Sequence, residues 1–284
     1  MYKALSPGAV GIRDLPLAQS IDLAARHGFE GVSFDVREAA ALAADGGAGR
    51  VRDLFARAGV QPAHWNVPVA WSQDTWRDDL AELPRLAALA RELGCDRCTT
   101  WMPPGSDTRP YAENFAWHVE RYRAIAEVLK AHDCRFGIEF IGPKTQRAQF
   151  KHEFIYSLAG LHELSEAIGT GNVGVLLDAW HVYTAGDAMD VVRRLTNRDV
   201  VLVHVNDAPP GIPIDRQNDH ARALPVETGV MDLAGFMREL RAIGYDGPVI
   251  PEPFSQRLNE RAPTDPDGVA REVAESMDAL WRLS

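Results

Sequence analysis

A short apolar run, a polar loop and a helix rich in Ala, Leu, Arg and Glu recur as one unit along the whole 284-residue chain. The runs that resemble strands are Lys3–Leu5, Gly31–Val36, Gln61–Trp65, Arg97–Met102, Arg135–Phe140, Val173–Asp178, Val200–Asn206 and Pro248–Glu252. Strands that alternate regularly with helices pair in parallel through right-handed crossovers. This recurrence constrains the fold more than any other feature, because few architectures repeat one strand-and-helix unit.

The helical stretches that follow these runs are Leu17–Arg26, Val51–Ala58, Leu80–Leu93, Ala112–Ala131, Ile155–Ile168, Ala188–Leu195, Leu233–Ile243 and Val269–Leu283. Several of them end in a glycine, which favours the left-handed backbone that stops a helix. Eight units of roughly 35 residues have the size of a (β/α)8 barrel. We therefore predict an α/β fold, a single (β/α)8 TIM-barrel domain over residues 1–284 with eight parallel strands. The alternative, a doubly wound open sheet, usually carries a GxGxxG or GxxxxGK[ST] phosphate loop, and the sequence has neither.

The charge balance excludes some classes of partner. Thirty basic and forty acidic residues give a net charge of −10, and proteins that grip nucleic acid usually carry a basic stripe instead. No run of about 18 apolar residues predicts a membrane span, and the first residues do not resemble a signal peptide. Three cysteines fit a reducing compartment. We expect a cytoplasmic protein without nucleic-acid or membrane partners, acting on a small molecule as a monomer or a homo-oligomer.

Four successive strands end in a side chain that could bind a metal ion. In a barrel of this kind functional residues lie at the C-terminal ends of the strands. Side chains alternate along a strand, and the outer face must be apolar to meet the helices. Alternation therefore turns Glu139, Asp178, His204 and Glu252 toward the barrel mouth. A single acid at a strand end often caps a helix, but four polar ends in succession are harder to explain in this way.

Three carboxylates in one dry barrel mouth are costly unless a cation neutralises them or some are protonated. One divalent metal ion would neutralise them directly. Three carboxylates and one imidazole form an oxygen-rich set that suits Mn²⁺, Mg²⁺ or Co²⁺. We expect one divalent ion, with Mn²⁺ favoured and Zn²⁺ also compatible.

The same four residues lie in the segments GIEF, LLDAWH, VHVND and PEPF. In these segments the chain resembles the xylose-isomerase-like TIM-barrel superfamily of sugar phosphate isomerases and epimerases, including ketose 3-epimerases and inosose-processing enzymes. The resemblance implies that the four residues bind one metal ion. It also implies that His181, which forms a DxxH pattern with Asp178, contacts the substrate. Relatives often have P-G-x-G after the seventh strand, whereas this chain has P-V-E-T-G at positions 225–229.

The predicted chemistry is a proton transfer beside a metal-bound carbonyl group. A metal that holds neighbouring carbonyl and hydroxyl oxygens stabilises the charge that develops when the adjacent carbon loses a proton. The transfer needs a base on one face and an acid on the other. The resemblance assigns these catalytic roles to Glu139 and Glu252, with an enediolate between them. We expect a divalent-metal-dependent isomerase or epimerase of carbohydrate metabolism, acting on a ketose or a related sugar or polyol.

Three other functions fit part of the pattern. A metal-dependent lyase or dehydratase acting on a keto-inositol or a 3-keto glycoside would begin with the same proton removal and then expel a β-substituent. An AP endonuclease-type phosphodiesterase would need additional histidines and affinity for DNA, which the acidic composition disfavours. A non-catalytic binding subunit could use the metal for stability alone.

Other residues at the predicted mouth are candidates for substrate binding. His64 and Trp101 end the third and fourth strands, where an aromatic face could pack on a sugar, although Trp101 could equally belong to the core. Arg216 and Arg222 lie in a long loop after His204, and long loops at the working face of a barrel often act as lids. His118 is expected on a helix surface.

Two further features are interpreted as structural. Lys144 and Arg147 could contact an anionic substrate, but a solvated loop explains them better. Cys95 and Cys98 form a CxxC at the start of a strand, which places it at the opposite end of the barrel from the mouth.

Overall fold

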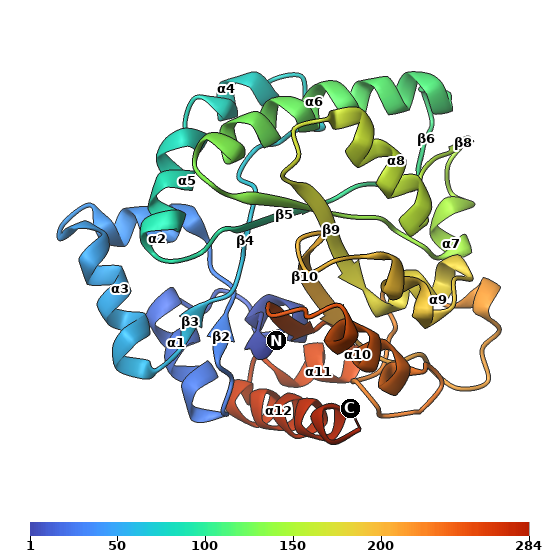
Figure 1. Ribbon diagram of the computed structural model, residues 1–284. Helices are drawn as coiled ribbons and strands as arrows, with labels where there is room; N and C mark the ends of the chain where they lie inside the picture. Colours follow the sequence, from blue (N-terminus) through green and yellow to red (C-terminus); the bar gives the residue numbers. More distant parts are fainter. Residues whose placement is uncertain (284) are drawn as a thin grey trace.

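The computed structural model describes residues 1–283, so Ser284, the last residue of the predicted domain, lies outside the described residues. A curled, parallel sheet forms the centre and helices surround it (Figure 1). Its order is β3-β2-β1-β11-β10-β9-β7-β5-β4. These strands are β1 (Tyr2–Leu5), β2 (Gly31–Val32), β3 (Gln61–Pro62), β4 (Trp65–Asn66), β5 (Arg97–Trp101), β7 (Arg135–Glu139), β9 (Val173–Asp178), β10 (Val200–Val205) and β11 (Pro248–Pro251). The parallel α/β TIM-barrel architecture is thus confirmed.

The predicted count of eight strands is not confirmed, because the sheet has nine strands within residues 1–283. The difference arises in the predicted strand Gln61–Trp65, which forms two strands, β3 and β4, on either side of Ala63 and His64. β3 pairs with β2, whereas β4 pairs with β5. The two strands at the ends of the sheet order are therefore consecutive in the chain.

Of the eight predicted helical stretches, Ala188–Leu195 forms a 3-10 helix and the other seven lie close to observed α-helices, whereas five further α-helices were not predicted. The structure has twelve α-helices within residues 1–283. They are α1 (Leu17–Arg26), α2 (Val36–Ala43), α3 (Gly47–Ala58), α4 (Trp76–Leu80), α5 (Leu83–Glu92), α6 (Tyr111–Ala131), α7 (Lys144–Arg147), α8 (Leu158–Ile168), α9 (Ala179–Ala185), α10 (Leu233–Ala242), α11 (Gln256–Arg261) and α12 (Pro266–Arg282). Short 3-10 helices are η1 (Pro7–Val10), η2 (Met189–Arg194) and η3 (Ile214–Arg216). Within residues 1–283 no helix has the length and apolar character needed to cross a membrane.

Two apolar clusters hold the sheet and helices together. The larger one includes buried side chains of the helices and of the strand faces that meet them. The smaller one joins Ala4, Ala63, Leu176, Leu202 and Ile250 from five segments of the sheet. Leu176, Leu202 and Ile250 precede Asp178, His204 and Glu252 by two residues each, so alternation gives both sets the same strand face. Apolar packing inside the curled sheet thus supports the polar strand ends.

A second, antiparallel pair of strands covers part of α6. It consists of β6 (Gly105–Ser106) and β8 (His152–Glu153). Phe154, which follows β8, stacks on His118 with ring centroids 4.8 Å apart, and His118 is buried. The expectation that His118 lies on a surface is therefore wrong, because this later segment covers a helix face that would otherwise be exposed.

Candidate metal centre

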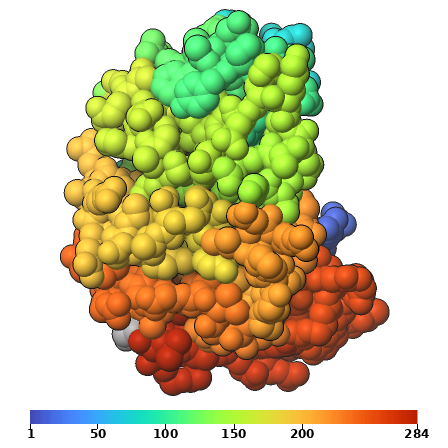
Figure 2. All heavy atoms as spheres, turned by 90° about the vertical axis from the view of Figure 1, so that its right-hand side faces the viewer, coloured from blue at the N-terminus to red at the C-terminus, as the bar shows by residue number. Residues whose placement is uncertain are grey.

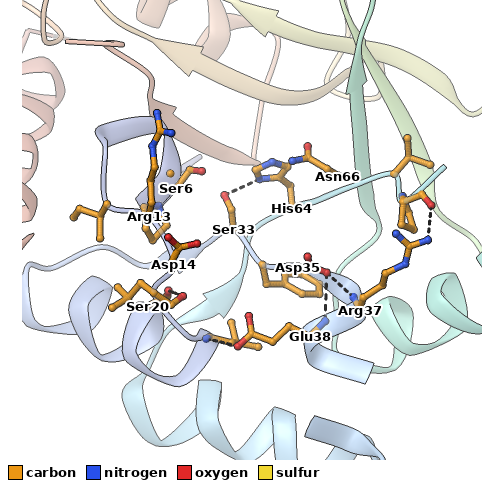
Figure 3. A pocket seen from close by; sticks show the side chains of 18 residues that line it. Ser6, Arg13, Asp14, Ser20, Ser33, Asp35, Arg37, Glu38, His64 and Asn66 are labelled. Carbon is orange, nitrogen blue, oxygen red and sulfur yellow. Dashed lines mark hydrogen bonds between the residues drawn. The ribbon is translucent and has the colours of Figure 1, made fainter. Parts of the chain in front are cut away.

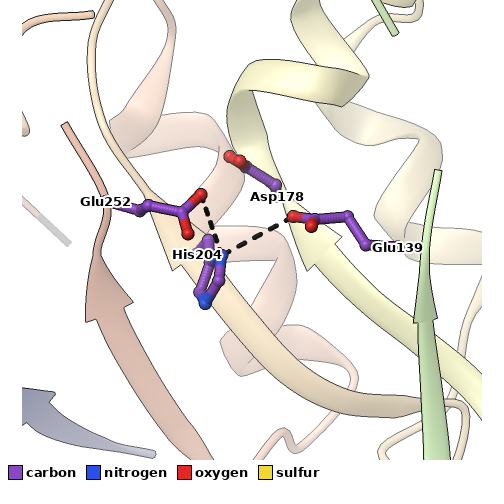
Figure 4. A group of neighbouring side chains, drawn as sticks. All are labelled: Glu139, Asp178, His204 and Glu252. Carbon is purple, nitrogen blue, oxygen red and sulfur yellow. Dashed lines mark ion pairs between the residues drawn. The ribbon is translucent and has the colours of Figure 1, made fainter. Parts of the chain in front are cut away.

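The structure brings the four polar strand ends into one cluster (Figure 4). Glu139 ends β7, Asp178 ends β9, His204 lies in β10 and Glu252 follows β11 directly. Register places Asp178 beside His204 on neighbouring strands. One potential ligand atom from each of the four residues lies within 4.8 Å of all the others. The parallel strands end at one edge of the barrel, and the sheet's register therefore builds the cluster.

Two buried atoms of this cluster form no hydrogen bond with any described residue. They are Glu139 Oε1 and His204 Nδ1, which lie 3.6 Å apart. His204 Nδ1 also lies 3.2 Å from Glu252 Oε2. Buried polar atoms normally have a partner, and a metal ion would supply one to both. Carboxylate oxygens and an imidazole nitrogen suit a divalent metal ion, so the residues fit that group.

The electrostatics of the cluster also favour a cation. Burial raises the pKa of Glu139, and the charge of Glu252 adds to this effect. Burial alone would lower the pKa of His204, but the carboxylates of Glu252 and Glu139 outweigh burial and hold that pKa well above its usual value. The cluster thus stabilises positive charge at its centre, whether a proton or a metal ion carries it.

Asp178 is fixed by several partners before any ligand binds. Its Oδ1 accepts hydrogen bonds from the Trp180 backbone N–H at 2.8 Å and from Asn206 Nδ2 at 3.0 Å. The first of these bonds caps α9. Burial opposes ionisation of Asp178, but the nearby Arg222 guanidinium helps to lower the pKa of this carboxyl group below its usual value. A rigid, ionised carboxylate is suited to bind a cation.

Arg222 lies among the carboxylates of the cluster. Its Nη1 is 2.7 Å from Asp178 Oδ2 and 3.1 Å from Glu252 Oε2, and its Nη2 is 2.8 Å from Asp219 Oδ1. The guanidinium also lies 4.7 Å from the ring centroid of Phe254. The sequence suggests a substrate contact for Arg222. The structure shows a buried cation that neutralises and orients two of the four potential ligands.

His181 approaches the cluster from the first turns of α9. Its Nδ1 accepts a hydrogen bond from the Gly142 backbone N–H at 3.2 Å, and Arg222 Nη2 lies 3.5 Å from its Nε2. That nitrogen lies 3.7 Å from Asp178 Oδ2 and 3.9 Å from Glu139 Oε1. Glycine is needed at position 142 because a Cβ there would overlap the His181 carbonyl oxygen. The close contact fixes the ring beside the cluster.

His64 lines an open cavity (Figure 3), and its other neighbour is His204 of the cluster. Its ring centroid is 6.5 Å from that of His204, and its Nδ1 lies 2.9 Å from Ser33 Oγ. Burial, together with the nearby His204, lowers the pKa of His64 to about 3, so the ring is neutral at physiological pH. The cavity has a volume of about 730 Å³ and is lined by residues that follow β1, β2 and β3. That volume is in the range of small-molecule sites.

The remaining candidates lie further from the cluster. Trp101 pairs in register with Glu139 but is 57% exposed at the barrel rim. Arg216 is exposed on η3, and no hydrogen bond or ion pair within residues 1–283 joins its side chain to the four residues. Lys144 pairs with Asp215 at 2.8 Å, and Arg147 pairs with Glu153 at 3.3 Å. The interpretation of a solvated loop is therefore wrong in part, because both residues lie in α7 and, although Lys144 is exposed, the Arg147 side chain is mostly buried against the ring of Tyr156.

Two residues of the site escaped sequence reasoning. Asn206 lies on the same strand face as His204, so alternation could have identified it as a partner of Asp178. Asp207 is buried, and its carboxylate accepts hydrogen bonds from the backbone N–H groups of Gly229 at 2.7 Å and Met231 at 3.0 Å. No local pattern indicates Asp207, because these partners follow more than twenty residues later.

The loop that Asp207 holds packs over neighbouring parts of the site. Thr145 Oγ1 donates a hydrogen bond to the Gln217 carbonyl oxygen at 2.8 Å, which joins α7 to the end of η3. Figure 2 shows the orange atoms of this loop against the yellow-green segment that contains α7. The loop is thus anchored at both its base and its outer side.

Comparison with known proteins identifies several similar chains. A family model described as xylose isomerase-like TIM barrel matches residues 21–280. The inosose isomerase of Bacillus velezensis is 18% identical over 275 residues, which cover 95% of this chain and 94% of that protein. The structure of a xylose isomerase domain protein from Alicyclobacillus acidocaldarius has 31% identity and a TM-score of 0.87, and the match covers 100% of this chain and 99% of that one.

Two further solved structures share the fold at lower identity. The IolI protein with a bound zinc atom is 16% identical with a TM-score of 0.76, covering 99% of this chain and 96% of that one. D-psicose 3-epimerase in the presence of D-fructose is 16% identical with a TM-score of 0.74, covering 100% and 99%. At this identity the similarity concerns the fold alone.

Proposed function

Because the chain belongs to the xylose isomerase-like TIM-barrel family, we propose that it is a divalent-metal-dependent isomerase or epimerase of a ketose or a related sugar or polyol. The observation that carries this proposal is the convergence of Glu139, Asp178, His204 and Glu252. Three carboxylates and an imidazole meet at one strand edge, and two buried atoms among them lack a hydrogen-bond partner within the described chain. The similar inosose isomerase and D-psicose 3-epimerase support the reaction class.

Four side chains would hold the metal ion: Glu139, Asp178, His204 and Glu252. The oxygen-rich donor set favours Mn²⁺, and the zinc bound to the IolI protein supports a divalent ion more generally. A divalent ion bound there would supply Lewis-acid stabilisation of negative charge on a substrate carbonyl oxygen. Arg222 would keep Asp178 and Glu252 in their ionised, oriented form. His181 would hold its Nε2 toward the same region, beside Arg222, Asp178 and Glu139.

Glu139 and Glu252 would move the proton. They come from different strands and approach His204 from opposite sides (Figure 4). A substrate carbon between them would lose its proton to one carboxylate and receive a proton from the other on the opposite face. His64, which is neutral, would hydrogen-bond the substrate where it leaves the cluster for the cavity.

The three cysteines support a proposal about the cellular location of the protein. Cys95, Cys98 and Cys134 are free and buried. Unpaired cysteines are typical of proteins that work in a reducing compartment. We propose that the protein acts in the cytoplasm.

Elemental analysis tests the metal site. We expect about one divalent ion per chain after expression with Mn²⁺, Mg²⁺, Co²⁺ and Zn²⁺ supplied in turn, and we expect a chelator to remove it. The double variant Glu139→Gln with Glu252→Gln should retain far less metal. Metal-free wild-type protein after every supplementation would contradict the proposal.

Solvent exchange tests the reaction. The metal-loaded protein is incubated in D₂O with ketoses, inosose and 3-keto glycosides, and NMR follows deuterium at the substrate carbons. We expect deuterium at the carbon next to the carbonyl in a product of unchanged composition. A product that has lost water or another β-substituent would indicate the lyase or dehydratase instead. Turnover without any deuterium uptake would contradict proton transfer by two exchangeable carboxyl groups.

A further inference from the structure

The cavity beside His64 contains charged residues that the proposed reaction does not use. They lie in the loop after η1, in the segment that joins β2 to α2 and in the first turn of α2. The cavity opens at the same end of the barrel as the metal cluster, and His64, which lines the cavity, is a neighbour of His204. The ring centroids of His64 and His204 are 6.5 Å apart, so the part of a cluster-bound substrate that extends past His64 enters the cavity.

Most charged groups of the cavity already have structural partners. Asp35 caps α2 by accepting hydrogen bonds from the backbone N–H groups of Arg37 and Glu38. Glu38 Oε1 accepts from the Leu17 backbone N–H at 2.7 Å. Arg37 pairs with Glu82 at 3.2 Å and donates to a backbone carbonyl oxygen. These groups hold the wall of the cavity and have little capacity left for a ligand.

Arg13 and Asp14 differ from the other charged groups. Both are exposed to the cavity, and neither side chain forms an ion pair or hydrogen bond with any residue in the described range 1–283. Figure 3 shows them on the side of the cavity away from Arg37, with Ser33 and His64 between. Asp14 also has a positive φ of 55°. Aspartate and asparagine adopt that conformation more readily than most residues, so the loop holds Asp14 at this position without a glycine.

The charges of this pair define what the cavity can bind. One cation and one anion side by side give no net attraction for an anionic group, and a phosphate would carry nearly two negative charges into the neighbourhood of Asp14. Hydroxyl groups suit both residues, because they can donate to the carboxylate and accept from the guanidinium. Lys144 and Arg147, the other cations considered for a phosphate, are paired with Asp215 and Glu153.

We infer that the substrate is an uncharged polyhydroxylated molecule, and that Asp14 and Arg13 bind its hydroxyl groups at the end remote from the metal cluster. The inference rests on the proposed function, since it concerns the same site. It assigns specificity to the loop after η1, while the cluster performs the chemistry.

Matched sugars test the inference. Isothermal titration calorimetry on the Mn²⁺-supplemented protein compares D-fructose and D-tagatose with their 6-phosphates, and includes myo-inositol. We expect at least one uncharged probe to bind, and each uncharged ketose that binds to do so about tenfold more tightly than its phosphate. Binding of no uncharged probe, or tighter binding of a phosphate than of its parent sugar, would overturn the inference.

Single substitutions test whether Asp14 and Arg13 are responsible for binding the uncharged sugar. Asp14→Asn keeps the side-chain shape, and asparagine tolerates the same backbone conformation, so the fold should persist. This change should weaken binding of the uncharged probe about tenfold, because a charged acceptor is lost, and should narrow the difference from the phosphate. Arg13→Gln should also weaken binding of the uncharged probe. Asp45→Asn and Arg50→Gln, which make the same charge changes at exposed positions outside the cavity, should have no effect.

The outcomes separate this inference from the proposed function. Binding is measured without turnover, so a protein that binds uncharged sugars through Asp14 but holds no metal would refute only the metal-dependent reaction. A protein that exchanges a substrate proton, but whose sugar binding is unchanged by Asp14→Asn and Arg13→Gln, would refute only the inference about the cavity.

Discussion

The two halves of the barrel mouth have opposite characters. On one half, β9 and β10 are six residues long each, and they position a buried network in which Arg222 contacts three carboxylates. On the other half, β2, β3 and β4 are only two residues long, and their connections surround an open cavity. The long strands fix side chains by register, whereas the short ones leave the chain free to form a pocket wall.

This difference suggests a division of labour. Chemistry requires groups held within fractions of an ångström, and the regular strands provide that precision. Recognition of different substrates requires variable shape, and connecting loops provide that freedom at low cost to the fold. We call the side of the mouth with the four potential ligands the cluster half, and the side with Arg13 and Asp14 the cavity half. We propose that the cluster half determines the reaction and that the cavity half determines which molecule undergoes it. Each of the following predictions tests one side of this comparison.

The largest expected effect is on the rate of the chemical step. Glu252→Gln should lower kcat by about 10²–10⁴-fold, because it removes a group that transfers a proton. Arg13→Gln, on the cavity half, should instead raise KM with little change in kcat. Steady-state kinetics on the substrate found by deuterium exchange measures both. Glu275→Gln, an exposed acid on α12, is the matched control and should behave like the wild type. If Glu252→Gln and Arg13→Gln lowered kcat equally, the proposal that the two halves have separate roles would be contradicted.

Removal of the metal ion from the cluster half should lower the stability of the folded protein. An ion that binds only the folded protein stabilises it by about 2.7 kcal/mol at a concentration one hundred times Kd. For a chain of this size that corresponds to a rise in Tm of about 5 °C, measured by calorimetry with and without Mn²⁺. Glu139→Gln should abolish most of the rise, whereas Asp14→Asn should leave it unchanged. A full rise in the Glu139→Gln variant would place the ion elsewhere.

The two halves also differ in how far the sequence predicts them. Glu139, Asp178 and His204 could be placed because they end apolar strands whose alternation is clear. The sequence did not predict Arg222 as their counter-ion, because a loop residue meets them only through tertiary folding. Arg13 and Asp14 have no periodic pattern around them, and only the cavity shows that they share a wall.

On the side of the barrel mouth that contains the cavity, the predicted strand ends also differ from the observed ones, and the reason is physical. The predicted strand Gly31–Val36 ends at Val32, because Asp35 caps a helix that begins at Val36. Its apolar residues thus continue past the sheet into the cavity wall. In contrast, the predicted strand Val173–Asp178 is observed with the same bounds, because its neighbours on both sides complete the ladder.

A smaller effect should follow from crowding His181. Gly142→Ala would place a Cβ 2.9 Å from the Ala185 backbone nitrogen and against the His181 carbonyl oxygen. We expect a loss of about 1–3 kcal/mol in the free energy of unfolding, measured by urea denaturation. Gly49→Ala, in α3 with no close neighbour, should instead stabilise by about 0.5–1 kcal/mol. If both substitutions changed the free energy of unfolding in the same direction, the close packing around Gly142 would make no measurable contribution to stability.

The smallest expected effect concerns the backbone of Val226, in the loop that Asp207 holds. Val226 stands in the segment P-V-E-T-G, and its φ is 59°, a conformation that is costly for a β-branched residue. Val226→Gly should relieve strain of about 1–3 kcal/mol, lose some packing, and raise the free energy of unfolding by roughly 0.5 kcal/mol. Val230→Gly, at an exposed position without a positive φ, should lower it instead. If urea denaturation showed that Val226→Gly and Val230→Gly lower the free energy of unfolding equally, the Val226 conformation would carry no strain. The loop would then tolerate valine because its anchor at Asp207 determines the path of the backbone.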